Sequence, residues 1–255
     1  MKLSIVIPVY NEESTVHKLI ETVLATLSKL PSGLSDFEII IVEDCSKDRT
    51  KDVLIQHYSE HPQISLFFQL FNQGKGAAIA RGFQEVKGDI VIIQDADLEY
   101  DPQDYQILVR PIVEGKADVV YGSRFKGDVT RVLYFWHYLG NLFLTLISNM
   151  LSNINLIDME TCYKVFKAPL IKNMILECKR FGIEPEITAK IAKVKGVRIY
   201  EVPISYFGRT YEEGKKIGWK DGVAAIWYIL KFNLFYSFEQ SFRITYQELK
   251  KLIYS

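Results

Sequence analysis

The stretch Asp89-Ile90-Val91-Ile92-Ile93-Gln94-Asp95-Ala96-Asp97 decides the fold that we predict for this chain. Its four consecutive isoleucine and valine residues show no polar alternation, which is typical of a short strand buried on both faces of a parallel sheet. In such sheets ligands bind where the carboxyl ends of the strands open into a crevice. We therefore expect the two carboxylates that follow this apolar run to lie in a binding site.

Apolar runs and helical patterns alternate on both sides of this stretch. We predict strands over residues 3–9, 37–42, 64–70, 89–94 and 118–121, and helices over 13–30, 48–58, 76–86 and 102–113. This alternation predicts an α/β fold in which a mostly parallel sheet is covered by helices.

The second half of the chain is less regular. We expect an apolar helix over 132–151, helices near 169–178 and 185–195, a strand over 197–202 and a long aromatic helix over 219–238. Because no linker-like run separates the halves, we expect a single domain over residues 1–255.

The composition excludes several classes of protein. The chain has 255 residues, with 31 Lys+Arg against 31 Asp+Glu, so it lacks the overall basic charge that drives nucleic-acid binding. The zero net charge results from two halves of opposite charge. Residues 1–125 carry 12 basic and 19 acidic side chains, whereas residues 126–255 carry 19 basic and 12 acidic side chains. Three scattered cysteines without a CxxC pair predict a reducing compartment and no structural zinc. The N-terminal residues lack a secretory signal, which predicts a cytoplasmic location.

Residues 132–151 contain no Asp, Glu, Lys or Arg, and a segment of that length could span a bilayer. However, His137, Asn141, Ser148 and Asn149 would be costly in hydrocarbon. These polar positions recur at roughly helical spacing, as on an amphipathic helix. We expect a buried or membrane-surface helix, with a membrane span as the alternative.

The acidic turn after the decisive strand is a candidate metal site. Asp95 and Asp97 can share one hard cation, and Glu99 offers a third oxygen ligand. Mg²⁺ and Mn²⁺ prefer oxygen ligands and keep open positions for substrate phosphates. Asp residues also often form turns or helix caps, and that is the structural alternative.

Two further loops carry candidate binding residues. Glu43 and Asp44 follow the second strand too early to cap the next helix, and a nucleotide base or ribose would explain these otherwise costly acceptors. Ser46, a little later, is a possible helix cap. In the segment 72–78, glycines flank Lys75 before a helix, which suits an anionic ligand. A plain glycine turn is the alternative, and the spacing excludes a P-loop.

The ordered motifs resemble those of the family 2 inverting glycosyltransferases, which have the GT-A fold. The segment Ser4–Glu12 resembles their opening motif, residues 42–50 their VDDGSxDxT loop, 72–78 their NxGKGxA turn and 94–98 their DxD motif. Gly122-Ser123-Arg124-Phe125 is similar to the GSR segment of the polyprenyl-phosphate mannose synthases. The resemblance covers about residues 1–220.

The resemblance implies a role for each matching residue. The donor nucleotide sugar would be bound by Pro8, Tyr10, Glu12, Glu43, Asp44, Ser46, Lys75, Asp95, Ala96, Asp97 and Arg124. The metal ligands would be Asp95, Asp97 and Glu99. The catalytic group would comprise Asp97, Arg124, Asp158, Arg209 and Lys216. Residues 1–125 would form the nucleotide-sugar-binding half, and 126–255 the acceptor-side half with the apolar helix and C-terminal amphipathic helices.

The sequence departs from the family pattern at several positions. Glu43 and Cys45 replace the usual Asp and Gly, and Glu99 stands where this branch often has Gln. The apolar helix lacks the arginine that usually contacts the acceptor phosphate, and Arg131 or His137 could substitute for it.

The resemblance implies a metal-dependent enzyme that transfers a mannose- or glucose-type hexose from a GDP- or UDP-sugar to a polyprenyl phosphate. It would act at the membrane surface, on the inner face of the cell membrane. A phosphate acceptor needs no general base, whereas a hydroxyl acceptor needs a carboxylate such as Asp158, Glu160, Glu184 or Glu186. Transfer to a saccharide or small hydroxyl acceptor is one alternative, and a non-enzymatic nucleotide-sugar-binding protein is another. The donor base, sugar, lipid and oligomeric state stay open.

Overall fold

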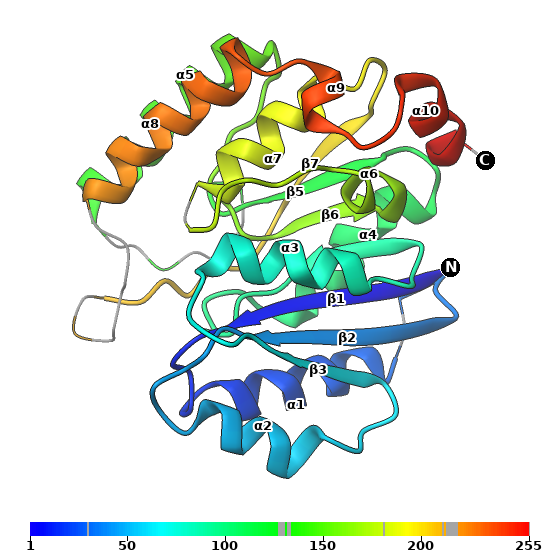
Figure 1. The fold of residues 1–255 in the computed structure, drawn as a ribbon, viewed down its shortest axis with the longest axis vertical. Coiled ribbons are helices and arrows are strands. Elements are labelled where there is room, and N and C mark those ends of the chain that lie inside the picture. Colours follow the sequence, from blue (N-terminus) through cyan, green and yellow to red (C-terminus); the bar gives the residue numbers. More distant parts are fainter. Residues whose placement is uncertain are drawn as a thin grey trace.

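A computed structural model of the chain describes residues 1–29, 31–126, 131, 134–180, 182–210, 212 and 219–254. The described residues form a seven-stranded sheet with the strand order β3-β2-β1-β4-β6-β5-β7 (Figure 1). The strands are β1 Lys2–Val9, β2 Asp36–Glu43, β3 Ile64–Phe68, β4 Ile90–Ile93, β5 Val119–Ser123, β6 Lys164–Lys167 and β7 Ile199–Pro203.

The strands of the first half are parallel, as predicted. β1 pairs with β2 and β4, and β2 pairs with β3, all in parallel register. Val9 lies opposite Glu43 and Val6 lies opposite Ile93, so these strands end at the same edge of the sheet. All four residues of β4 are buried, which confirms the expectation from its uninterrupted apolar run.

The helices between these strands also follow the prediction. They are α1 Val16–Leu27, α2 Thr50–Tyr58, α3 Lys75–Glu85, the 3-10 helix η1 Pro102–Asp104 and α4 Tyr105–Val113. Helix α3 packs closely on β1, because a Cβ at Gly82 would lie 2.4 Å from the Val6 side chain. Figure 1 shows α1 and α2 beyond β3 at the lower end of the molecule.

The sequence reasoning missed β6, which runs antiparallel between β4 and β5. Ile92 and Val120 both lie opposite Val165. The strand has four residues and begins and ends with lysine, so its hydrophobic pattern is too short to be recognised. Lys164 is nevertheless buried, and its ammonium lies 5.2 Å from the centre of the Tyr121 ring.

The second half contains α5 Phe135–Ser152, α6 Ala168–Lys172, α7 Ile183–Ala192, α8 Trp219–Leu234, α9 Phe238–Ser241 and α10 Tyr246–Tyr254. The helix expected over 132–151 corresponds to α5, although residues 132 and 133 lie outside the described part of the chain. Helices α5 and α8 lie side by side at the upper left of Figure 1. Within the described residues, no helix has the length and apolar character needed to cross a membrane.

Two predicted helices end earlier than expected. The helix expected over 169–178 stops with α6 at Lys172, because the backbone N–H groups of Glu177 and Cys178 donate to the Glu186 carboxylate instead, each at 2.8 Å. The helix expected over 219–238 ends at Leu234, and Ser237 then caps the separate helix α9.

Candidate active site

The loops after β1 and β2 are joined by hydrogen bonds at the carboxyl edge of the sheet. Asn11 adopts a left-handed backbone conformation with φ of 53°. Its N–H donates to the Ser46 hydroxyl at 3.0 Å, and its side-chain oxygen accepts from the Lys47 N–H at 2.8 Å. Pro8 lies beside Val42 in the β1–β2 pairing. The structure thus brings the predicted residues of the first two motifs together at one edge.

Glu43 and Asp44, the two buried acids predicted to face a base or ribose, have protein partners. The Glu43 carboxylate accepts the N–H groups of Cys45 at 3.2 Å and Ser46 at 2.5 Å. The Asp44 carboxylate accepts the Gly74 N–H at 2.7 Å, together with the Asn72 side-chain amide and the Gln73 N–H. Burial raises the pKa of Asp44, although these backbone donors oppose the increase. Both acids therefore hold the shape of the loops that would contact a nucleotide.

The glycine turn before α3 packs against the backbone of residues 178–180. A Cβ at Gly76 would lie 2.0 Å from the Cys178 carbonyl oxygen, and Gly74 has φ of +98°. Only glycine allows this approach without movement of the neighbouring loop. The Lys75 ammonium points between two carboxylates, at 2.9 Å from Asp95 and 3.1 Å from Glu184. Burial would lower the pKa of Lys75, but these carboxylates outweigh it and raise the pKa.

The acidic turn follows β4, as the sequence predicts. Asp95 and Asp97 are partly exposed, the intervening Ala96 is buried, and Leu98 has a left-handed φ of 63°. Burial, the charge of Asp95 and the charge of Glu99 together raise the pKa of Asp97 to about 7. Burial and the two neighbouring acids thus disfavour the ionised form of Asp97, and a cation at the turn would favour it.

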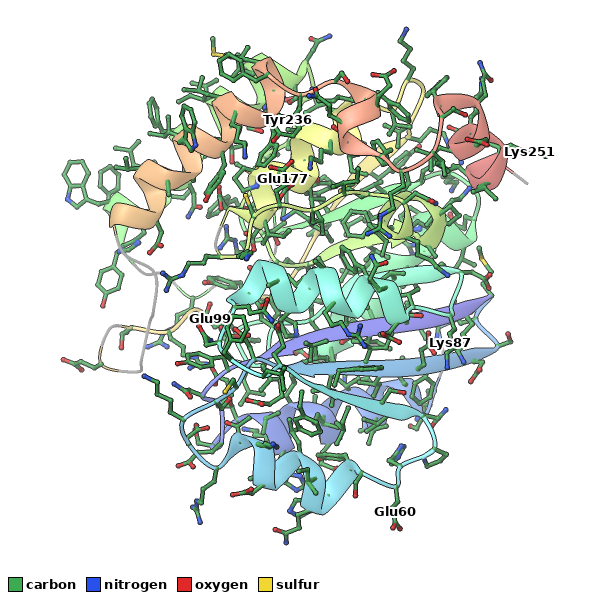
Figure 2. All side chains as sticks on the ribbon, viewed as in Figure 1. Glu60, Lys87, Glu99, Glu177, Tyr236 and Lys251 are labelled. Atoms are coloured by element: carbon green, nitrogen blue, oxygen red, sulfur yellow. The ribbon has the colours of Figure 1, made fainter. Side chains whose placement is uncertain are left out.

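The Glu99 carboxylate, predicted as a third metal ligand, binds the segment after β7 instead. It accepts the Tyr206 hydroxyl at 2.7 Å and the Arg209 N–H at 2.8 Å, and its backbone carbonyl accepts the Phe207 N–H. In the view of Figure 2, Glu99 is drawn toward the same side of the molecule as the ends of β1 and β2. Glu99 thus attaches the segment 206–209 to the acidic turn.

The Arg209 side chain lies across the site. Its guanidinium donates to the Asp97 carbonyl at 3.0 Å and to the Glu12 carboxylate at 3.2 Å, and lies 3.9 Å from the Asp97 carboxylate. These contacts connect the motifs 4–12 and 94–98 to the segment 206–209. Lys216, the other predicted basic residue, lies outside the described residues.

Arg124 and Asp158 form a bidentate ion pair next to Tyr206, the residue that donates to Glu99. The Arg124 Nε and Nη2 each donate to the Asp158 carboxylate at 2.7 Å, and the Arg124 N–H donates at 3.0 Å. Asp158 is fully buried, and Glu201 accepts its N–H at 2.9 Å. The guanidinium also lies 5.2 Å from the Tyr206 ring centre. Asp158 therefore orients Arg124.

The sequence reasoning missed three contributors to this site. Tyr206 and Glu201 lie in a segment that carried no motif, and Lys164 lies on the missed strand β6. Glu184, considered above only as a possible base for a hydroxyl acceptor, lies in the first turn of α7 and pairs with Lys75. No local signal reveals such a pairing, because the two residues come from different elements.

The acidic turn fits a divalent cation that arrives with a diphosphate. Among the residues that the structure describes, no three His, Cys, Asp or Glu side chains converge as a ready-made metal site. Of the three predicted ligands, Glu99 accepts hydrogen bonds from Tyr206 and Arg209 and Asp95 pairs with Lys75, so a cation would compete with these partners for the two carboxylates. Mg²⁺ is commonly held by one or two carboxylates plus water and substrate phosphates. Two carboxylates, one with a raised pKa, satisfy this requirement.

The sequence is similar to several enzymes of sugar transfer. A model of glycosyl transferase family 2 matches residues 4–174. A dolichyl-phosphate beta-glucosyltransferase of Trichomonas vaginalis is 33% identical over 213 residues, which cover 80% of this chain and 65% of that protein. An undecaprenyl-phosphate mannosyltransferase of Micrococcus luteus is 27% identical over 239 residues, covering 89% and 92% of the two chains. The match to the Trichomonas protein spans just under two thirds of its length.

The fold is also found in solved structures. Glucosyl-3-phosphoglycerate synthase from Mycobacterium tuberculosis, in complex with Mn²⁺, UDP and phosphoglyceric acid, superposes with a TM-score of 0.69 at 18% identity. The superposition covers 91% of this chain and 78% of that chain. The predicted α/β GT-A architecture is confirmed by this likeness and by the sheet described above.

Proposed function

The chain belongs to glycosyl transferase family 2, and on that premise we propose that it transfers a hexose from a nucleotide diphosphate sugar to a polyprenyl phosphate. The named relatives, a dolichyl-phosphate glucosyltransferase and an undecaprenyl-phosphate mannosyltransferase, support this pairing of donor and acceptor. The donor is a GDP- or UDP-hexose of the mannose or glucose type.

The donor binds at the carboxyl edge of β1, β2 and β4. The loops with Pro8, Tyr10, Glu12 and Ser46 receive the nucleoside, and the buried acids Glu43 and Asp44 hold these loops in shape. The diphosphate lies at the acidic turn, where Asp95 and Asp97 would hold an accompanying Mg²⁺ or Mn²⁺. Such a cation would supply positive charge against the leaving diphosphate.

The basic residues around the turn stabilise the charge that develops during transfer. An oxygen of the acceptor phosphate forms a bond to the anomeric carbon as the bond to the nucleoside diphosphate breaks, and attack from the opposite face inverts that carbon. The electron pair remains on the leaving diphosphate. Arg209, already held above Asp97, is placed to stabilise that charge, and preorganised groups of this kind contribute strongly to catalysis.

A phosphate acceptor agrees with the state of Asp158. This carboxylate is buried and accepts three hydrogen bonds from Arg124, so it is poorly available as a general base. A phosphate acceptor is already anionic near neutral pH and requires no base. Arg124, oriented by Asp158, instead suits the attacking phosphate through its planar array of donors.

The observation that carries the proposal is an apolar surface that begins beside Arg124. The Phe125 ring packs edge-on against Tyr138 of α5, with ring centres 5.0 Å apart. Exposed apolar side chains also recur along the neighbouring helices α5 and α8. They are Phe135, Trp136, Tyr138, Leu139, Phe143, Leu146, Met150, Val223, Trp227 and Leu234. We call this set the α5–α8 face.

The α5–α8 face rests on a membrane surface, where a polyprenyl phosphate presents its headgroup. Helix α5 has no charged residue, and exposed Trp and Phe on one face are typical of interfacial helices. The enzyme would then work on the cytoplasmic face of the cell membrane. Residues 1–125 would serve the donor and 126–255 the acceptor within one domain.

Transfer of labelled sugar to lipid tests the proposed function. Purified protein is incubated with Mg²⁺ or Mn²⁺, labelled UDP-glucose or GDP-mannose, and undecaprenyl phosphate in detergent. Label in the organic phase with one donor supports the proposal. If no donor labels the lipid while a saccharide acceptor is labelled, the hydroxyl-acceptor alternative is correct.

Vesicle binding tests the α5–α8 face separately. We expect the protein to sediment with vesicles of phosphatidylglycerol and phosphatidylethanolamine, and we expect Trp136→Ser with Phe143→Ser to abolish this. Phe71→Ser, also at an exposed aromatic residue but next to the glycine turn, is the control. A wild-type dimer that the double substitution dissociates, without vesicle binding, would show that a second copy covers the face.

A further inference from the structure

Glu160, which has one buried carboxylate oxygen, and the buried Lys164 are charged groups that the mechanism above does not use. Lys164 is 1% exposed, and its ammonium donates to the Thr161 carbonyl. Burial lowers the pKa of Lys164, opposed by Glu184 and other nearby acids. An ammonium has three donors, so a single acceptor leaves Lys164 with unused hydrogen-bonding capacity.

Two acceptors nearby lack partners among the described residues. The Glu160 Oε1 and the Thr161 hydroxyl are both buried, and neither makes a hydrogen bond there. Burial, followed by the charge of Glu184, raises the pKa of Glu160 to about 8. Buried polar atoms without partners are rare in native proteins and require an explanation. Two of them next to an under-used ammonium indicate a site for a polar ligand.

Glu160 and Thr161 lie on a segment that joins two parts of the candidate active site. Asp158 at the start of this segment pairs with Arg124, and the Cys162 Sγ at its end lies 3.9 Å from the carbonyl oxygen of Ile93, the last residue of the strand that leads into the acidic turn. The charges of Glu184 and Arg124 also act on the Glu160 carboxylate. A transferred group must lie between the leaving diphosphate and the attacking phosphate, and this segment connects the residues that we assign to those two groups.

We propose that Glu160, Lys164 and the Thr161 hydroxyl form the subsite that binds the hydroxyl groups of the donor hexose. The inference rests on the proposed function, since it assigns the sugar of the same donor. A sugar hydroxyl both donates and accepts hydrogen bonds, so it can donate to a carboxylate oxygen and accept from an ammonium. Neighbouring hydroxyls of one ring would satisfy the unused capacity of all three residues.

Other acids at the site are less suitable for this role. The carboxylates of Asp44, Glu43 and Asp158 already accept two or more backbone or guanidinium donors each. The Glu99 carboxylate binds Tyr206 and Arg209. A site that must recognise hydroxyls needs acceptors that the protein has not already satisfied, and a mismatch then leaves them unpaired.

Affinities for the donor with and without its sugar test the proposal without any lipid. Calorimetry with Mg²⁺ compares UDP with UDP-glucose, and GDP with GDP-mannose, for the wild type and Glu160→Gln. For Glu160→Gln, we expect the affinity for the nucleoside diphosphate to change by less than about twofold. The affinity for the cognate nucleotide sugar should fall by about tenfold, which corresponds to about 1.4 kcal/mol, the contribution of one lost hydrogen bond. Glu60→Gln, in the exposed turn after α2, should change neither.

Thr161→Val provides a second variant. Its hydroxyl has no partner among the described residues, so the valine should fold at least as stably and still weaken binding of the nucleotide sugar. Equal losses for diphosphate and nucleotide sugar, or no loss for the sugar in both variants, would overturn the proposal. So would a loss of turnover in Glu160→Gln with unchanged donor affinity, which would identify Glu160 as a base. If lipid labelling fails while these sugar-specific losses appear, the proposed acceptor is wrong and the subsite stands.

Discussion

Replacing Asp158 by Asn tests whether this buried carboxylate orients Arg124. The carboxylate is fully buried and accepts three hydrogen bonds from Arg124, two of them at 2.7 Å from the guanidinium. Asn has nearly the same shape as Asp but no charge, and its side-chain NH₂ group would face the N–H donors of the Arg124 guanidinium. Removing one partner of a buried ion pair costs about 3–5 kcal/mol. Because the Asn oxygen can still accept one bond and Arg124 retains some exposure, we expect about 3 kcal/mol.

Urea unfolding measures this change in stability. With a slope of about 3 kcal/mol per molar urea, the midpoint should fall by about 1 M. Asp52→Asn, in the exposed first turn of α2, is the matched control and should cost at most about 1 kcal/mol. Kinetics should show a raised KM for the lipid phosphate and an unchanged KM for the donor. A midpoint within about 0.2 M of wild type would refute the assignment of Asp158 as the group that orients Arg124.

Three further predictions concern other parts of the molecule. Asp97→Asn should abolish the Mn²⁺-dependent rise in melting temperature that the cognate donor causes in the wild type. Without ligand, the variant should be no less stable than the wild type at pH 8. The reason is that the pKa of Asp97 is raised in the folded protein, so ionisation of this carboxyl group opposes folding. A lower unliganded melting temperature would contradict this. Gly76→Ala should lower the free energy of unfolding in urea by about 1–3 kcal/mol and weaken donor binding, because the added Cβ would lie 2.0 Å from the Cys178 carbonyl oxygen. Stability and binding equal to those of the wild type would show that the loop around Cys178 moves without cost. Burial would raise the pKa of Asp118, but hydrogen bonds from Arg198 outweigh it and lower the pKa, so its stabilisation should be present above about pH 4 and lost in more acidic solution. Melting curves of Asp118→Asn should therefore approach those of wild type as the pH falls, and a constant difference would exclude this linkage.

The two oppositely charged halves meet at the candidate active site. Arg209 from the basic half contacts Glu12 and Asp97 from the acidic half. Arg124 and Asp158 also form an ion pair between the halves, but here the base comes from the acidic half and the acid from the basic half. The neutral total thus hides two oppositely charged halves, which are joined by ion pairs where a diphosphate and its cation would bind.

Sequence alone determined the parallel half of the sheet, the loops at its carboxyl edge and the family. These features depend on local information, because a buried strand requires a continuous apolar run and a ligand-binding loop requires particular residues directly after it. The positions of Asp95, Asp97 and Lys75 followed from this pattern. The apolar helix over 132–151 was also recognisable from its composition, as α5 shows.

Only the tertiary structure decided how the site is connected. The Arg209–Glu12 hydrogen bond joins residues 197 positions apart, and the Lys75–Glu184 pair joins two different helices. Strand β6 is stabilised by pairing with β4 on one side and β5 on the other. Its own four residues are too few to show a recognisable strand pattern. The partner of a buried charge depends on which distant segments the folded chain brings within a few ångströms, and no local periodicity encodes that. For this reason the roles of Glu99, Asp158 and Glu160 became definable only in the folded protein.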